Sequence, residues 1–514
     1  MLVTGLMVIF LCQSCGKGER SDHNPNPDIK EFTFETLSAY QRKVLTEYID
    51  YYFPNGKQTP DLLTDNASIR TITRLAEALL FRNNAGDREN AFQILEWVLK
   101  YQNTDITTPE YGVWRTSVAD DRKDQNWREF VGCDLIIIYQ KYKSILPETL
   151  RAKIENGLLH AAKGASIRDV SPYYTNISVM SAFLMEFTGS AFRDEKLRMS
   201  GIKKAKEIQT LFQSQGTFSE FNSPTYYGVT MVGLALWREM AFSAELREMG
   251  KSLERNLWTQ MGLFYNASLK NFCGPYFRGY GMDVMKYNAI AGIWIAMALN
   301  DENLAPLPRI NGAKYDELSN IVPVLHLGIR VSENDLKCFR KFPSAQNISQ
   351  LVPNKYPGDS LKKVTAFISE HVMMGGVWGS RRPWGQIKAG TIHWAAPGNG
   401  IGWILIPGDG KTNIEVKGNC MKLYLADRQV KYLELFLNQD PASSLLTDTK
   451  WKFPGKSFGI KTSLKINSPE KVNQNDFKDL LEIAESCPSL VRIVCEIPEN
   501  WDVEIPVIEI TPEP

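Results

Sequence analysis

The chain has 514 residues, with 59 Lys and Arg against 58 Asp and Glu and a formal net charge of +1. This balance, without a long basic stripe, excludes electrostatic capture of nucleic acid as the basis of function. The length suffices for two large domains with cores of their own. Aromatic residues make up 11% of the chain, including 12 Trp and 20 Tyr, which fits large cores or surfaces on which sugar rings stack.

The first residues have the pattern of an export signal. Leu2–Leu11 is an apolar run too short to span a membrane, and it leads into Cys12-Gln13-Ser14-Cys15-Gly16. This resembles a bacterial lipoprotein signal with Cys15 as the acylated residue, although no Lys or Arg precedes the run. We expect a signal peptide over residues 1–15, a polar tether over 16–30, and a protein exported and lipid-anchored to the outer membrane.

Hydrophobic periodicity divides the remaining chain into two parts. Apolar spacing predicts helices near residues 36–53, 66–82, 88–103, 127–145, 147–163, 174–189, 193–213, 225–242, 244–259 and 282–299. Antiparallel helix pairs with long loops suit an (α/α) toroid, a double ring of helices, over residues 31–305. A linker follows over 306–330.

The last part of the chain reads as strands. Residues 367–377, 391–393, 402–406, 413–416, 421–426, 429–436, 458–466, 490–496 and 503–510 alternate or run apolar between Gly and Pro. They predict an antiparallel β domain, a sandwich or sheet, over residues 331–514. The expected fold class is therefore α+β and multidomain.

The cysteines beyond the export signal show no Cys-x-x-Cys spacing that would suggest zinc. We expect buried free thiols, with a disulfide between Cys487 and Cys495 as the alternative. No His or Cys pair has ligand spacing, so no metal and no other cofactor is expected.

Two helix starts share unusual chemistry. Ser223-Pro224 precedes the apolar helix Val229–Trp237, and Glu220, Asn222, Thr225, Tyr226 and Tyr227 crowd its N-terminus. Ser171-Pro172-Tyr173-Tyr174-Thr175-Asn176 repeats the pattern before another apolar helix. Free N–H groups and the helix dipole at such an end favour an anionic ligand. An ordinary N-cap with aromatic packing explains a single such start equally well.

Further polar and aromatic groups are candidates for the same site. Tyr111–Arg115 and Asn126–Phe130 flank a polar loop, and Gly274–Asp283 is a glycine-rich loop in which Arg278 either pairs with Asp283 or binds a carboxylate. The β domain contributes Gly379–Gln386 and the pair His393-Trp394. Of the five histidines His393 has the most aromatic, Arg-rich setting, which makes it a candidate base beside a purely structural role.

These motifs together resemble bacterial polysaccharide lyases built from an (α/α) toroid and an antiparallel sheet, the heparinase II/III type. Within this group the family suggested is the L-rhamnose-α-1,4-D-glucuronate lyases, which trim arabinogalactan side chains. The resemblance covers residues 110–405 and implies an acidic oligo- or polysaccharide substrate, with membrane contact only through the lipid anchor.

Such a lyase removes the C5 proton of a uronic acid, so it needs donors on the carboxylate and a base on the proton. The catalytic candidates are Tyr226, His393, Asn222 and Tyr280. The substrate-binding candidates are Asn176, Tyr174, Tyr227, Arg278, Trp127, Arg115, Arg381, Arg382, Trp384 and Gln386. The helix starts at Asn176 and Asn222–Tyr227 and the Arg278–Tyr280 loop are expected to share one mouth of the toroid, with the β domain closing over it.

Two other classes remain open. A toroid glycoside hydrolase would use paired carboxylates, for which Glu129, Asp134, Glu220 and Asp283 are available. A non-catalytic surface glycan-binding lipoprotein would need aromatic platforms but no titratable cluster.

Overall fold

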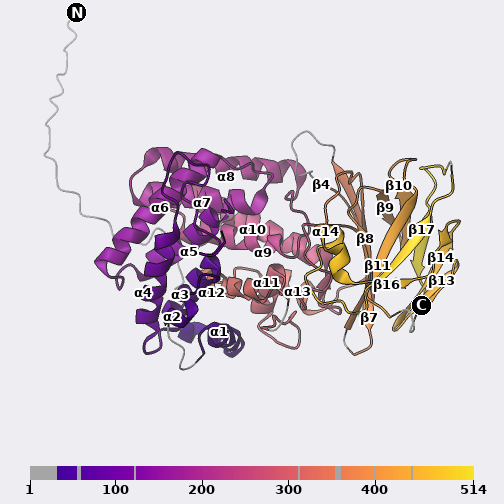
Figure 1. Ribbon diagram of the computed structural model, residues 1–514, viewed down its shortest axis with the longest axis horizontal. Coiled ribbons are helices and arrows are strands. Elements are labelled where there is room, and N and C mark those ends of the chain that lie inside the picture. Colours follow the sequence, from indigo (N-terminus) through magenta and orange to yellow (C-terminus); the bar gives the residue numbers. More distant parts are fainter. Residues whose placement is uncertain are drawn as a thin grey trace, which may run out of the picture.

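A helical domain is followed along the chain by a β domain, which lies at the other end of the molecule (Figure 1). The computed structural model describes residues 32–54, 59–120, 123–310, 313–352, 361–398, 400–440, 444–499 and 501–514. The predicted fold class is confirmed. Cys15, the signal peptide and the tether lie outside the described residues, and every helix of the described part is too short or too polar to cross a membrane.

The helical domain consists largely of long helices that alternate in direction. Its elements are η1 (Phe34–Thr36), α1 (Ala39–Tyr52), α2 (Thr59–Leu62), α3 (Ile69–Arg82), α4 (Asp87–Val98), η2 (Leu99–Tyr101), α5 (Trp127–Tyr142), α6 (Glu148–Arg168), α7 (Thr175–Ala191), α8 (Glu195–Gln215), α9 (Tyr226–Met240), α10 (Ala244–Phe264), α11 (Ile290–Leu299), η3 (Tyr315–Asn320), α12 (Ile321–Leu327) and α13 (Glu333–Arg340). Local signals set several ends: the hydroxyls of Ser68 and Ser243 accept N-terminal N–H groups, and Gly216 ends α8 with a left-handed backbone.

Helices α3, α5, α7, α9 and α11 form the inner arc, and α4, α6, α8 and α10 pack outside it as their antiparallel partners. Helix α12 contacts α3, α5, α9 and α11, and η3 contacts both α11 and α3, so these two elements close the arc. The inner helices α3, α5, α7 and α9 are each separated by one antiparallel outer helix. Their N-termini therefore share one end of the ring.

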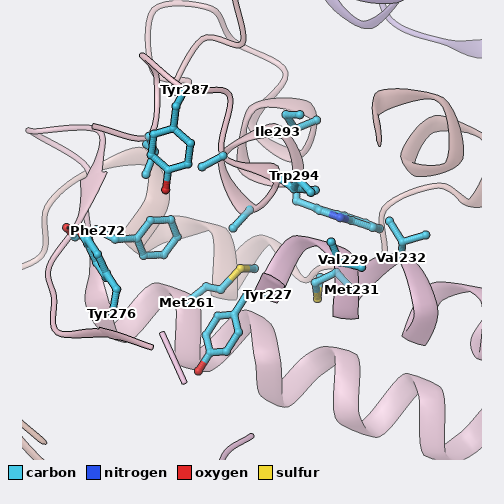
Figure 2. Close-up of a cluster of buried hydrophobic side chains, with 14 of the residues drawn as sticks. Tyr227, Val229, Met231, Val232, Met261, Phe272, Tyr276, Tyr287, Ile293 and Trp294 are labelled. Atoms are coloured by element: carbon cyan, nitrogen blue, oxygen red, sulfur yellow. Dashed lines mark hydrogen bonds between the residues drawn. The ribbon is translucent and has the colours of Figure 1, made fainter. Parts of the chain in front are cut away.

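The packing between α9 and α11 is close enough to need glycine. A Cβ on Gly228 would lie 2.4 Å from the backbone carbon of Ile290. The Trp294 indole donates to the Gly228 carbonyl at 3.0 Å. Figure 2 shows the apolar cluster around this contact, where Tyr227, Met261, Phe272, Tyr276 and Tyr287 also gather. This rigid packing fixes the position of the α9 N-terminus.

The β domain contains antiparallel strands in two sheets. The elements are β4 (Gln346–Val352), β5 (Lys362–Ile368), β6 (Val372–Trp378), β7 (Ile387–Ala396), β8 (Gly400–Pro407), β9 (Thr412–Lys417), β10 (Cys420–Leu425), β11 (Tyr432–Leu437), β12 (Leu445–Leu446), β13 (Lys450–Phe453), β14 (Lys456–Thr462), β15 (Lys465–Ile466), β16 (Glu470–Lys471), η5 (Gln474–Phe477), α14 (Lys478–Leu481), β17 (Val491–Glu496) and β18 (Ile508–Pro512). The larger sheet has the order β15-β17-β11-β8-β7-β6-β5-β4, and the smaller sheet β12-β13-β14-β18-β10-β9. Strand β9 packs on β5, β6 and β7, so the sheets form a sandwich.

A strand from the helical part joins the larger sheet. The segment between α10 and α11 contains β1 (Tyr265–Asn266), β2 (Asn271–Phe272) and β3 (Tyr276–Phe277). Strand β3 pairs with the start of β7, with Tyr276 opposite Lys388 and Phe277 opposite Ile387. The Gly274 N–H also donates to the Thr391 hydroxyl at 3.0 Å. The loop after β3 is thereby held against the residues that precede β7.

Several sequence expectations differ from the structure. Residues 282–289 form a loop, since Asn288 has a left-handed backbone (φ 53°), and α11 begins only at Ile290. The expected 306–330 linker contains the buried helix α12, and α13, capped by Ser332, lies within the residues assigned to the β domain. The expected strand 367–377 is the hairpin of β5 and β6. Cys487 and Cys495 are free thiols, so the disulfide alternative is wrong.

Candidate functional site

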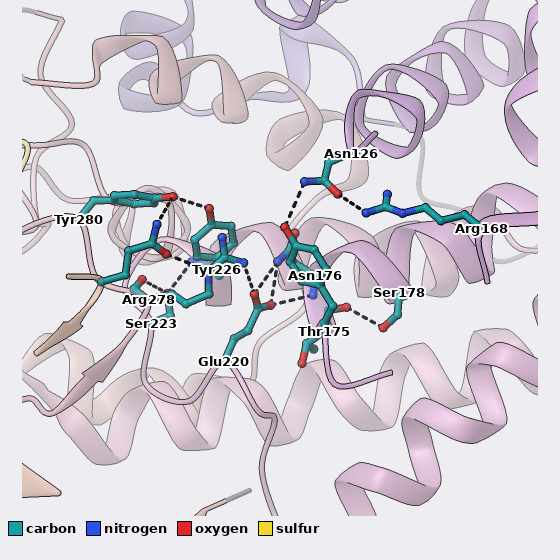
Figure 3. A network of polar contacts seen from close by, with 12 residues as sticks. Asn126, Arg168, Thr175, Asn176, Ser178, Glu220, Ser223, Tyr226, Arg278 and Tyr280 are labelled. Carbon is teal, nitrogen blue, oxygen red and sulfur yellow. Dashed lines mark hydrogen bonds and ion pairs between the residues drawn. The ribbon is translucent and has the colours of Figure 1, made fainter. Parts of the chain in front are cut away.

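Glu220 is the centre of a polar cluster at the N-termini of α7 and α9 (Figure 3). Its carboxylate accepts from the Asn176 backbone N–H at 2.9 Å and from the Asn176 side-chain amide at 2.8 Å. Nη1 of Arg278 lies 2.5 Å from the same carboxylate. Glu220 is 3% exposed, so this pair is a buried, charge-assisted contact that fixes the Arg278 side chain.

The Arg278 guanidinium is placed among aromatic rings and reaches the β domain. It lies 3.6 Å from the Tyr226 ring centroid, 5.3 Å from that of Tyr174 and 5.5 Å from that of Trp384. Its Nε donates to Gln386 Oε1 at 3.1 Å. Burial lowers the pKa of Arg278, but the Glu220 carboxylate and the neighbouring phenols raise it by more than burial lowers it. The net pKa is therefore above the ordinary value, and the guanidinium stays charged. The expected alternative pair with Asp283 is not formed; Arg278 pairs with Glu220.

The backbone of Arg278 is held in an unusual conformation. Its φ of 75° lies in the left-handed region, which costs a non-glycine residue free energy. The Ser223 hydroxyl donates to the Arg278 carbonyl at 2.7 Å and accepts from the Tyr226 N–H at 2.9 Å. The helix begins later than the sequence predicts, at Tyr226 with Thr225 as its N-cap residue, but the Ser223 hydroxyl still binds its first N–H and also positions the loop that carries Arg278.

Two phenols meet beside this guanidinium. The hydroxyl oxygens of Tyr226 and Tyr280 lie 2.7 Å apart, and Gln386 Nε2 donates to the Tyr280 oxygen at 3.3 Å. The Lys314 ammonium lies 4.2 Å from the Tyr280 ring centroid. Burial raises the pKa of Tyr226 well above its ordinary value, although the Arg278 charge opposes this increase. Tyr226 is therefore a neutral phenol near pH 7.

The pairing of β3 with β7 explains why both domains contribute. Arg278 and Tyr280 follow β3 directly, Gln386 precedes β7, and the Gly279 N–H donates to the Gln386 carbonyl at 2.7 Å. The Ala484 N–H, from the β domain, donates to the Tyr280 carbonyl at 2.7 Å. The phenol pair therefore lies at the junction of the two domains.

A second polar chain extends the cluster toward α5. The Asn126 amide donates to the Tyr174 hydroxyl at 3.1 Å, and Arg168 Nη2 donates to Asn126 Oδ1 at 2.9 Å. Nη1 of Arg168 lies 3.3 Å from Glu129, whose pKa burial raises to about 7 against the effect of the nearby arginines. Arg168 and Lys314 were not among the residues singled out from the sequence. Arg168 is the last residue of α6 and lies three residues before Ser171. This position is the only feature of the sequence that could have indicated its role, and no such feature marks Lys314.

A cavity adjoins each end of this cluster. One, of about 770 Å³, is lined by Trp127, which follows Asn126, by Asp124, which accepts the Asn126 N–H, and by Asn66, Ser68, Thr116, Ser117, Asp120 and Lys123. The other, of about 1080 Å³, is lined by Ala313, which precedes Lys314, and by Ala484, which donates to Tyr280. The cluster is thus flanked by space on both sides.

Three predicted site residues are buried and turned away from this junction. His393 on β7 is 0% exposed, shares a 3.1 Å hydrogen bond between Nε2 and the Met282 carbonyl, and has a pKa lowered to about 3 by burial. Asn222 is 1% exposed and donates to the carbonyls of Cys273 and Pro275. The Tyr227 hydroxyl is buried beside Thr217 at 3.4 Å. The geometry gives these three residues structural contacts, so they are corrected from site residues to supports of the loops around the site.

Four other predicted residues lie outside the cluster. Arg115 is half-buried and donates to the Val118 carbonyl at 3.4 Å, and Trp127 faces the smaller cavity with Arg70 5.1 Å from its ring centroid. Arg381 and Arg382 are exposed on the loop before β7. Tyr174, Asn176, Tyr226, Arg278, Tyr280, Trp384 and Gln386 are the predicted residues that the structure brings together.

The carboxylates considered for a hydrolase do not form an open pair. Glu220 is engaged by Asn176 and Arg278, and Glu129 is fully buried beside Arg168. Asp134 is buried on Arg74 at 3.0 Å, and Asp283 accepts the Met285 N–H at 3.1 Å. Within the described residues no group of three or more His, Cys, Asp or Glu side chains is placed to hold a metal ion.

The fold and the site together define a class of protein: an incomplete (α/α) toroid joined to an antiparallel β-sandwich, with a Tyr–Arg–Gln cluster at the junction. The chain belongs to the family described as a domain of unknown function, DUF8769, whose family model matches residues 58–328. This match spans the helical domain from α2 to the end of α12. A search of curated proteins found no match.

Solved structures similar to the chain include several polysaccharide lyases, the broad group that the sequence motifs resemble. Heparinase III has 12% identity and a TM-score of 0.47, covering 96% of this chain and 88% of its own. A Streptomyces coelicolor A3 chondroitin AC lyase has 9% identity and a TM-score of 0.43, covering 93% and 80%. The heparan sulfate lyase HepC from Pedobacter heparinus has 11% and 0.39, covering 96% and 86%. Because these TM-scores are below 0.5, the chemistry of this chain rests on its own residues.

Proposed function

We propose that the protein is an exported polysaccharide lyase that cleaves the glycosidic bond to a uronic acid of the glucuronate type by β-elimination. The observation that carries this proposal is the phenol pair of Tyr226 and Tyr280 beside Arg278 and Gln386 at the domain junction. These groups are a proton acceptor, a proton donor and a fixed positive charge in one place. β-Elimination at a uronate needs these three functions.

The reaction removes the C5 proton of the uronate, forms the C4–C5 double bond and expels the oxygen attached to C4. Charge develops on the carboxylate as the C5 proton leaves, and a fixed cation stabilises that charge. Arg278 has this role in the proposal, since its pKa is raised and its position is fixed by Glu220 and Gln386.

The two phenols are assigned different roles from their surroundings. Tyr280 is the proposed base, because the Tyr226 hydroxyl and the Gln386 amide can both donate to its oxygen and Lys314 lies over its ring. Tyr226 is the proposed proton donor to the departing oxygen, because burial keeps it neutral. Two titratable groups with differing environments are a common acid–base arrangement.

The experiment that tests this proposal is incubation of the protein with a panel of uronic-acid polysaccharides, arabinogalactan among them, while ultraviolet absorbance is followed. An unsaturated uronate product absorbs there and a hydrolysis product does not. New reducing ends without ultraviolet absorbance would show hydrolysis and reject the lyase in favour of the glycoside hydrolase. Binding of a polysaccharide without any product would reject both enzymes in favour of the non-catalytic glycan-binding protein.

Export and lipid anchorage are proposed on the sequence alone, from the apolar run that leads to Cys15. Replacement of Cys15 by Ala is expected to release the protein from the membrane fraction of producing cells. Unchanged partition of the Cys15→Ala variant between membrane and soluble fractions would contradict the anchor.

A further inference from the structure

The larger cavity beside Tyr280 carries an excess of positive charge. Lys286, Arg309 and Lys471 line it, and Glu485 is the acidic side chain among its described lining residues. Lys286 lies 3.7 Å from Asp283, whereas no ion pair of Arg309 or Lys471 is found among the described residues. Cations that form no ion pair with a described residue, in a shared concave wall, raise the local concentration of anions.

The acidic side chain of the cavity is turned toward the neighbouring loop. Glu485 is 3% exposed, and its Oε1 accepts the backbone N–H groups of Met282 and Asp283. A Cβ on Gly281 would lie 1.9 Å from its Oε2, so the whole carboxyl group packs against that loop. Glu485 therefore braces the loop between Tyr280 and α11 and forms no ion pair with Arg309 or Lys471.

The walls of the cavity are held by specific hydrogen bonds. The buried Asn288 side chain accepts the Arg309 N–H at 2.6 Å and donates to the Arg309 carbonyl at 2.5 Å. On the opposite wall, Gln474 donates to the carbonyls of Ile483 and Glu485 and accepts the Cys487 N–H. Lys471 lies on β16, which pairs with β17. The cations are thus carried by backbone that is already ordered, which lowers the entropy lost on binding.

The cavity lies next to the proposed catalytic cluster, which it adjoins through two neighbours of Tyr280. Ala484 lines the cavity and donates its N–H to the Tyr280 carbonyl, and Ala313 lines it next to Lys314, whose ammonium lies over the Tyr280 ring. The cavity at the other end of the cluster has a different character. Among its described lining residues Asp120 and Asp124 outnumber Lys123, and Trp127 supplies an aromatic face.

We propose that the cavity of Arg309 and Lys471 is a subsite for an anionic sugar, bound through a carboxylate or sulfate next to the unit at Tyr226 and Tyr280. This inference rests on the proposed lyase function and deepens it. It assigns the substrate a second acidic sugar beside the uronate that is cleaved. The Trp127-lined cavity lacks a comparable excess of cations among its described residues, so the proposal places the additional charge on the Tyr280 side of the cleaved bond.

Binding measurements test the subsite separately from turnover. The double variant Arg309→Gln/Lys471→Gln is compared with Lys417→Gln/Lys452→Gln, which removes the same charge from exposed positions on β9 and β13 of the smaller sheet. All binding measurements use the full chain with Tyr280→Phe, which is expected to prevent turnover, and cleavage of a uronate polymer is measured separately with Tyr280 intact. Calorimetric titration with oligogalacturonate tests carboxylate binding, a carrageenan oligosaccharide tests sulfate binding, and a neutral galactan oligosaccharide is the uncharged reference.

The cavity variant is expected to bind one acidic probe at least tenfold more weakly, with a smaller dependence of affinity on salt, and the control variant to stay within twofold of the parent. The probe whose affinity falls more identifies the anionic group, carboxylate or sulfate, that the subsite binds. Equal losses in both variants, or no binding of either acidic probe by the parent, would overturn the subsite. Cleavage of a uronate polymer with unchanged binding in the cavity variant would overturn the subsite but keep the lyase. A selective loss of binding in a protein that cleaves no uronate polymer would keep the subsite and remove the lyase.

Discussion

Tyr226 and Tyr227 are adjacent tyrosines at the start of α9, yet only one of them reaches the domain junction. The Tyr226 hydroxyl meets Tyr280, whereas the Tyr227 hydroxyl is enclosed beside Thr217 and has a pKa raised to about 12 by burial. Successive residues at a helix start point about 100° apart. The sequence motif Tyr226-Tyr227 thus identifies a pair of candidates, and the helix direction decides between them.

Replacing either phenol of the proposed pair by Phe is expected to lower turnover on a cleavable uronate polymer. General acid–base groups contribute about 10²–10⁴-fold, so Tyr280→Phe and Tyr226→Phe should each fall within that range. Tyr227→Phe on the same helix is the matched control and should keep near-normal turnover. Ultraviolet absorbance gives kcat, and thermal unfolding followed by circular dichroism tests folding. Near-normal turnover in both Tyr280→Phe and Tyr226→Phe would contradict the assignment.

Glu220 illustrates how a buried ion pair supports a site without itself touching a substrate. Removing its charge leaves Arg278 buried without its counter-ion, which costs about 3–5 kcal/mol. Glu220→Gln is therefore expected to lower the free energy of unfolding by about that amount in urea titration. Glu195→Gln, which breaks an exposed pair with Arg198 on α8, should change nothing measurable. Equal stability of the Glu220→Gln and Glu195→Gln variants would show that Glu220 does not hold Arg278 in place.

Strand β7 and helix α14 are connected by a buried lysine. The Lys388 ammonium is 0% exposed, donates to the Gly385 carbonyl at 2.7 Å and also contacts the Leu481 carbonyl. It thereby ties the start of β7 to the residue before Gln386 and to the short helix that precedes Glu485. Burial lowers the pKa of Lys388 to about 7, although Glu482 and Glu485 oppose this change.

This pKa predicts a pH dependence of stability. Between pH of about 7 and 10 the unfolded chain holds a proton on Lys388 that the folded chain has lost, so the free energy of unfolding rises with pH in that window. Lys388→Met should remove about 2–3 kcal/mol of this rise between pH 7 and pH 9.5. Lys452→Met, at an exposed position of β13, should keep the wild-type slope. Parallel urea-unfolding curves for wild type and Lys388→Met at both pH values would contradict the shift.

At the level of elements, local signals were sufficient for most of the helical domain. Ser68, Asp194 and Ser243 cap helices that apolar spacing already predicts, and the Ser-Pro pairs lie within four residues of the starts of α7 and α9. The burial of His393 could not be seen in this way. Its partner Met282 lies 111 residues away, and the contact depends on β3 joining β7. Long-range strand pairing is set by tertiary packing, for which no local sequence pattern exists.

At the scale of the whole molecule, the junction of toroid and sandwich depends on short segments from distant parts of the chain. The Arg278–Gln386 bond spans 108 residues, and the contact of Asn176 with Glu220 joins two helix pairs. The prediction that Asn176, Tyr226, Arg278 and Tyr280 gather at one mouth follows from the alternation of helix direction, and it matches the geometry. The sequence also suggested that Gln386 and Trp384 lie beside these residues. It did not indicate that Arg381 and Arg382, from the same segment, are exposed.

Gln386 gives the most direct test that both domains build one site. Its side chain accepts from Arg278 Nε and donates to the Tyr280 hydroxyl, so a single residue of the β domain contacts both groups of the helical domain's loop. A hydrogen bond to a charged group is worth about 1.5–3 kcal/mol. Gln386→Leu should therefore lower kcat on a cleavable uronate polymer by about 10–100-fold, with a smaller change in KM, because Gln386 positions the proposed base and the guanidinium rather than the substrate.

The matched control for this change is Gln350→Leu on β4 of the same sheet, whose side chain has no hydrogen bond among the described residues. That variant should keep both kcat and KM, which separates loss of the contact from loss of any glutamine in the sheet. A Gln386→Leu protein with wild-type kcat would show that the β domain only covers the toroid. A rise in KM alone would make Gln386 a substrate-binding residue rather than a positioning residue for Tyr280. The expected fall in kcat requires that the toroid loop and the sandwich act as one catalytic unit, because neither supplies the phenol, the guanidinium and the amide by itself.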